Sequence, residues 1–132
     1  MILVTPEIRA QLAANCEARY IAQRQNRREP DPAPVVRFFN PVGSATWLAT
    51  EIDEDDILFG LADLGFGCPE LGSFSLAELE SVELPWGLRI ARDIAFEGRF
   101  PLSVYAAAAR AAGSLVFAED LLGRAARSLR ER

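Results

Sequence analysis

Two acids on neighbouring predicted strands, Glu51 and Asp63, are the residues of this sequence best placed for acid–base chemistry. Alternate residues of a strand share a face, so Glu51 should lie on the same face as Trp47 and Ala49. If the two strands pair, Glu51 and Asp63 could converge. Paired carboxylates in a cleft can split their pKa values and act as acid and base. One hypothesis is therefore a small metal-assisted hydrolase or ligand-binding enzyme built on Glu51, Asp63, Arg92 and Asp93.

The same two acids have a structural interpretation. Carboxylates near a sheet usually need a partner, and three arginines could hold Glu51 and Asp63 against the segment that follows: Arg37, Arg89 and Arg92. We favour this interpretation over catalysis, although the sequence leaves both open.

The run Asp53-Glu54-Asp55-Asp56 suggests a cation site at first sight. An EF-hand loop that started at Asp53 would need glycine at its sixth position and glutamate at its twelfth, where this chain has Leu58 and Leu64. A looser magnesium site would need only one or two acids and water. A solvated acidic turn is the favoured interpretation, so we predict no metal site and no cofactor.

Several residue types are absent, and their absence limits the chemistry. The chain has no histidine, which removes Ser-His and Cys-His pairs and imidazole ligands. It has no lysine, no phosphate-binding glycine signature and no nucleophile elbow. These absences favour a non-enzymatic role.

The charge is strongly segregated along the chain. Between Arg37 and Arg89 the sequence has ten acids and no base, within a net charge of −5. This pattern argues against direct nucleic-acid binding, which usually needs a basic face. It favours an acidic surface that binds a protein, through imitation of the charge of DNA if the partner is a DNA-binding or defence protein. The candidate partner-binding residues are Asp53, Glu54, Asp55, Asp56, Trp47 and Glu70.

The elements that would position these residues can be predicted from periodicity, caps and turn residues. The expected helices are residues 6–26, 75–81, 101–112 and 116–130, and the expected strands are 35–39, 46–52, 57–64 and 71–74, with an ambiguous segment at 89–96. The predicted fold is α+β: an antiparallel meander of about four strands, flanked by an N-terminal helix and two C-terminal helices and covered on one face. Residues 1–132 should form one domain.

Two features bear on location and assembly. The longest nearly apolar stretch, Ile57 to Ala62, is far shorter than the ~20 residues of a spanning helix, and the N-terminus carries no export signal. We therefore expect a cytoplasmic protein without membrane contact. The last helix has apolar residues opposite its arginines and could mediate self-association: Leu115, Phe117, Leu121, Leu122 and Leu129.

Several short segments resemble an uncharacterised bacterial domain-of-unknown-function family, number 2958, which is often carried on plasmids and integrative elements. They are Phe39-Asn40-Pro41, residues 45–53, residues 59–65, Pro69-Glu70-Leu71-Gly72, residues 75–80, Gly87-Leu88 and Arg92-Asp93. The resemblance covers about residues 35–113. Ala91 stands where such sequences tend to have glutamate. The resemblance implies an accessory protein of a mobile element and supplies no activity.

Overall fold

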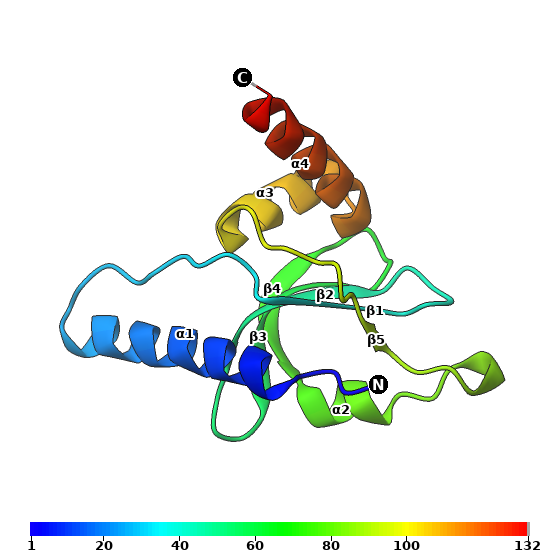
Figure 1. Ribbon diagram of the computed structural model, residues 1–132, viewed down its shortest axis with the longest axis horizontal. Coiled ribbons are helices and arrows are strands. Elements are labelled where there is room, and N and C mark those ends of the chain that lie inside the picture. Colours follow the sequence, from blue (N-terminus) through cyan, green and yellow to red (C-terminus); the bar gives the residue numbers. More distant parts are fainter. Residues whose placement is uncertain (132) are drawn as a thin grey trace.

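The structure is a computed structural model that describes residues 1–131 (Figure 1). Its elements, in chain order, are α1 (Pro6–Arg24), β1 (Val36–Phe39), β2 (Thr46–Ile52), β3 (Ile57–Asp63), β4 (Glu70–Ser75), α2 (Leu76–Ser81), the 3-10 turn η1 (Pro85–Gly87), β5 (Ala91–Arg92), α3 (Leu102–Ala112) and α4 (Leu115–Arg130). The predicted helices are all present. α1 ends two residues earlier than predicted, and α4 begins one residue earlier.

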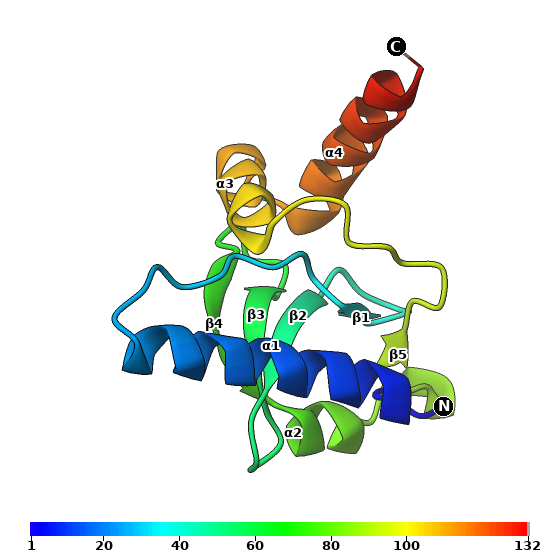
Figure 2. The ribbon, with the colours of Figure 1, turned by 60° about the vertical axis from the view of Figure 1, so that its left-hand side comes forward.

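The five strands form one antiparallel sheet in the order β4-β3-β2-β1-β5. Strands β1 to β4 follow one another as a meander, which confirms the predicted α+β class. The ambiguous segment at 89–96 contributes only the two-residue β5, which pairs with β1. β4 therefore forms one edge of the sheet, and Figure 2 shows it as the outer rim with no strand beyond it.

Local capping signals define the helix ends. The side chain of Thr5 accepts a hydrogen bond from the Ile8 amide at 3.2 Å, and Pro6 occupies the first turn of α1. Ser75 accepts one from the Glu78 amide at the start of α2. Gly113 ends α3 at a φ of 69°, a left-handed conformation that glycine adopts without a Cβ penalty. These caps explain why the helices were predictable from sequence.

Both faces of the sheet are covered, so the prediction of a sheet covered on one face is wrong. Leu48 and Ala49 are successive residues of β2 and point to opposite faces. Ala49 belongs to a core with α1, α2 and the N-terminal segment, whereas Leu48 belongs to a core with α3 and α4. All seven residues of β2 are buried, as expected for a central strand with helices on both sides.

A β-bulge interrupts the pairing of β2 with β3. Ala49 pairs with Gly60 and Glu51 pairs with Phe59, so Thr50 is an extra residue on β2. The bulge reverses the faces beyond it: Ile52 joins the core that contains Ala49, and Glu51 turns away from that core. The prediction that Glu51 shares a face with Trp47 and Ala49 is therefore wrong.

Candidate functional site

The four candidate catalytic residues do not meet in one cleft. Glu51 pairs with Phe59 near one end of the β2–β3 ladder, and Asp63 pairs with Thr46 at the other. Five residues of strand, or about 17 Å, separate the two positions. The predicted convergence of Glu51 and Asp63 is wrong because hairpin register places them at opposite ends.

Each of the two buried acids has a structural partner. Both carboxylate oxygens of Glu51 accept from Nε of Arg19 on α1, at 2.9 and 3.0 Å. Asp63 accepts the amides of Gly65 and Leu115, each at 2.9 Å, and thus ties the β3–β4 turn to the first residue of α4. The prediction that an arginine holds Glu51 is confirmed, but the arginine is Arg19 and not one of the three that were predicted.

Arg92 and Asp93 are engaged elsewhere. The Arg92 guanidinium donates to the main-chain carbonyls of Ile2 and Leu3 and so holds the N-terminal segment against β5. Asp93 lies 3.5 Å from Arg37, whose Nε also donates to both oxygens of Glu119 on α4, at 2.9 and 3.1 Å. Burial raises the pKa of Glu119, and the hydrogen bond from Arg37 only partly offsets this.

The acidic turn is stabilised largely from within. The Asp53 carboxylate accepts the amides of Asp55 and Ile57 at 2.8 and 3.0 Å, and Asp56 pairs with Arg9 at 2.7 Å. Glu54 and Asp55 are left exposed. Within residues 1–131, no group of three or more histidine, cysteine, aspartate or glutamate side chains is arranged to hold a metal ion.

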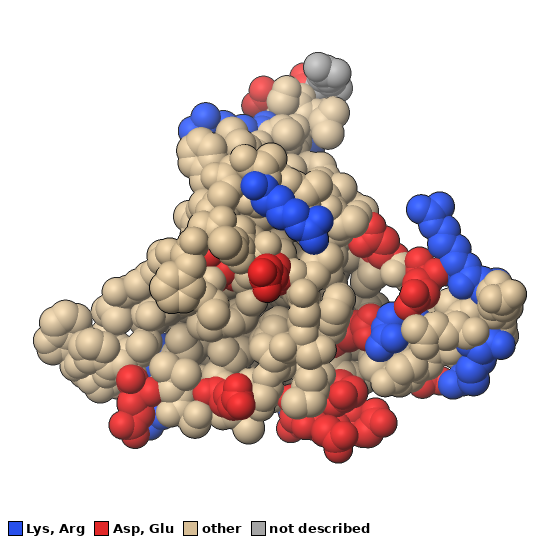
Figure 3. Space-filling view, turned by 180° about the vertical axis from the view of Figure 1, so that it is seen from behind, with Lys and Arg blue, Asp and Glu red and all other residues tan. Residues whose placement is uncertain are grey.

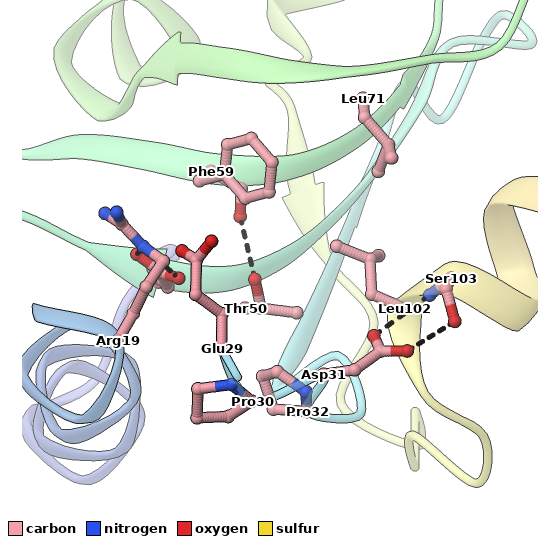
Figure 4. Close-up of a pocket in the computed structure, with 11 residues that line it drawn as sticks. Arg19, Glu29, Pro30, Asp31, Pro32, Thr50, Phe59, Leu71, Leu102 and Ser103 are labelled. Atoms are coloured by element: carbon pink, nitrogen blue, oxygen red, sulfur yellow. Dashed lines mark hydrogen bonds and ion pairs between the residues drawn. The ribbon is translucent and has the colours of Figure 1, made fainter. Parts of the chain in front are cut away.

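A cavity of about 420 Å³ lies between the Arg19–Glu51 pair, the proline-rich linker after α1 and the start of α3. Figure 4 shows Phe59, Leu71 and Leu102 around it. Asp31 in the linker accepts from the amide and the hydroxyl of Ser103, which joins the linker to α3. We call this space the α3-side cavity. Its walls are mostly apolar, and the polar groups lie at its two ends.

A second space, of about 410 Å³, runs along β4 on the side of α2. Trp47, Phe74 and Leu79 supply apolar surface there, and Glu70 and Glu78 also line it. We call it the α2-side groove. Trp47 is only 8% exposed and packs in the core. A partner could therefore contact Trp47 only from inside this groove. The aromatic residues that are most exposed, Phe66 at 83% and Trp86 at 85%, are not among the predicted partner-binding residues.

The two cysteines differ in environment. Cys16 is buried on α1, and burial raises the pKa of its thiol, so it stays protonated at neutral pH. Cys68, in the turn before β4, is exposed. Neither forms a disulfide within the described chain.

Eight of the ten acids between Arg37 and Arg89 are at least partly exposed, since only Glu51 and Asp63 are buried. In Figure 3, acidic side chains gather along the lower border, over α2 and the β2–β3 turn. We define the acidic rim as the exposed acids between Arg37 and Arg89 that form no ion pair with any residue of 1–131: Glu54, Asp55, Glu70, Glu78 and Glu80.

The fold is thus a five-stranded antiparallel sheet between two pairs of helices, with an open edge at β4. Residues 3–116 match the family described as protein of unknown function DUF2958, and the chain belongs to this family. The match ends at the first turn of α4. No curated protein and no solved structure is significantly similar to the chain. Among residues 1–131, no helix is both long and apolar enough to cross a bilayer.

Proposed function

We propose that this protein is a non-enzymatic interaction module that binds a basic protein partner through its acidic rim. The observation that carries the proposal is the set of five exposed acids without arginine partners on β4, α2 and the β2–β3 turn. Surface ion pairs contribute little to stability, and these five carboxylates have no arginine partner within the described chain that would compete with another molecule for them. Exposed charges of one sign steer an oppositely charged partner.

The partner that fits this surface best is a DNA-binding protein, because its own DNA-binding face is basic. In this role the chain would act in the cytoplasm as an accessory protein of a plasmid or other mobile element, directed against a defence or restriction protein. The alternative, a carboxylate hydrolase, loses support because Glu51, Asp63, Arg92 and Asp93 each bond to a different structural partner.

The test compares capture from a bacterial lysate by the native chain and by a rim variant, Glu54→Gln, Asp55→Asn, Glu78→Gln and Glu80→Gln. We expect mass spectrometry to identify a DNA-binding protein retained by the native chain and lost by the variant. Duplex DNA should compete with its binding, and higher salt should weaken it steeply, because exposed charges are screened.

A matched control changes the same amount of charge elsewhere: Glu7→Gln, Glu17→Gln, Glu97→Gln and Glu131→Gln, all at exposed positions. This control should retain the partner. Equal retention by both variants, or binding that does not respond to salt, would contradict the proposal. Circular dichroism of both variants verifies that the fold is intact.

We also propose that α4 pairs with α4 of a second copy. Leu121, Ala125 and Leu129 lie on one side of the helix, and the two leucines are 44% and 60% exposed. This row is symmetric about Ala125, so an antiparallel partner would place each Leu121 against the other copy's Leu129, with the small alanines at the two-fold axis.

Sedimentation velocity should show a dimer that Leu121→Ser with Leu129→Ser converts to a monomer. Val116→Ser, on another side of α4, should leave the dimer intact; a native monomer at high concentration would refute the pairing.

A further inference from the structure

The outer edge of β4 is an open hydrogen-bonding surface. β4 is the last strand of the sheet on its side, and none of its six residues is fully buried, in contrast to the seven buried residues of β2. Every second residue of an edge strand directs its amide and carbonyl away from the sheet. Figure 2 shows no strand beyond β4 that could accept these groups. The edge can therefore pair with another extended chain.

Apart from the charged Glu70 at its first position, β4 lacks the usual features that protect an edge. Its pairing with β3 is regular over six residue pairs from Ile57↔Ser75 to Ala62↔Glu70, without a bulge. Residues 70–75 contain no proline, lysine or arginine. Proteins normally block a free edge with such features because an open edge invites association. An unprotected edge of this length is consistent with a surface that is used for binding.

The strand also separates two recesses. The α3-side cavity and the α2-side groove lie against β4, and Leu71 contributes to both. Successive side chains of an added strand would point to opposite faces of the sheet. One set would enter the α3-side cavity over Phe59, and the other would enter the α2-side groove over Phe74. In recognition by strand addition, hydrogen bonds between backbones provide affinity and recesses for alternate side chains provide specificity.

The charge of the surroundings selects the occupant. Glu70 and Glu78 line the groove, and three carboxylates against one arginine line the cavity: Glu29, Asp31 and Glu51 with Arg19. The apolar residues that line the two recesses suit β-branched or aromatic side chains of a bound segment. The excess of acids suits arginine or lysine residues in the same segment.

We propose that β4 binds an extended, basic segment of the partner protein as a sixth strand of the sheet, with its apolar side chains in the two recesses. This inference rests on the proposed function and gives its mode of recognition. A second copy of the chain is the competing occupant, and the experiment separates the two.

The probe is a displayed library of random peptides, each about eight residues long so that it covers the six residues of β4. Selection against the full native chain should enrich peptides with alternating apolar residues and at least one arginine or lysine. Single N-methylation of alternate backbone amides in an enriched peptide should weaken its binding about tenfold at each position that pairs with β4, because one hydrogen bond is lost. Failure to enrich such peptides, or insensitivity to N-methylation, would overturn the proposal.

Two protein variants locate the site. Leu71 pairs with Leu61 on the α3 side of the sheet, so Leu71→Arg places a cation beside the α3-side cavity at a position already 39% exposed, and it should weaken peptide binding at least about tenfold. Ile94→Arg, at a residue 80% exposed beyond β5 at the opposite edge, should leave peptide binding unchanged. Equal effects of the two variants would refute the β4 site. A dimer of the native chain that Leu71→Arg alone dissociates would show that a second copy occupies β4, which also overturns the proposal.

Failure of strand addition at β4 can be told apart from failure of the proposed interaction function. If the lysate partner is lost by the acidic-rim variant but retained by Leu71→Arg, the interaction module stands and strand addition fails. If the native chain retains no partner at all, the proposed function itself fails.

Discussion

Replacing Gly60 with alanine is expected to destabilise the protein by about 3 kcal/mol, which is a large part of the total stability of a small domain. A Cβ at Gly60 would lie 1.8 Å from the Leu48 carbonyl oxygen and 2.9 Å from the Ala49 Cα. Both contacts are with the backbone of β2, which cannot rotate away as a side chain could. Either the bulge at Thr50 would have to open or β3 would have to move out of the sheet.

Gly72 provides the control, because it is paired directly with Gly60 on β4 and a Cβ there would meet nothing within 4 Å. Gly72→Ala should leave stability unchanged or raise it slightly, since alanine restricts the unfolded chain more than glycine does. Urea unfolding followed by circular dichroism measures both variants. Similar midpoints for Gly60→Ala and Gly72→Ala would show that the close approach at Gly60 is not a constraint.

Asp63→Ala should cost about 3 kcal/mol, because it leaves two main-chain amides without their charged acceptor. Asp63 is 4% exposed, and its bond to the Leu115 amide is buried. This bond also places a carboxylate at the positive end of the α4 dipole. We expect lower stability in urea and faster hydrogen exchange in the first turn of α4.

Asp120→Ala is the matched control for Asp63→Ala, since Asp120 is an acid of α4 itself. Its side chain is 52% exposed and pairs with Arg124 across one turn of the helix. Such a pair contributes at most about 0.5 kcal/mol. If Asp63→Ala is no more destabilising than Asp120→Ala, the tie between β3 and α4 has little energetic weight.

Helix boundaries and most strands were predictable because their signals are local. Thr5-Pro6, the Ser75 to Glu78 spacing and Gly113 each act on the few residues beside them. The two-sided burial of the sheet also had a signal, because Trp47, Leu48 and Ala49 are apolar in succession rather than alternating with polar residues. That signal was outweighed by the order of elements, which suggested a sheet with one covered face.

The candidate site was less predictable, since it depends on contacts between distant residues. Arg19 and Glu51 are 32 residues apart, and no local pattern distinguishes Arg19 from the other arginines as the partner. The bulge at Thr50 reversed the side of the sheet on which Glu51 lies. Its only trace in the sequence is a glycine in the middle of a strand, Gly60, which is a weak signal of close backbone approach.

The pairing of the bulge with Gly60 also bears on how the chain avoids misfolding. A hairpin of β2 and β3 that slipped by one residue would place Phe59 or Leu61 where the Leu48 carbonyl tolerates no Cβ. It would also exchange the buried and open faces of β3. The close approach at Gly60 therefore disfavours a slipped register of the β2–β3 hairpin, because the slipped pairing would bring a side chain against the Leu48 carbonyl.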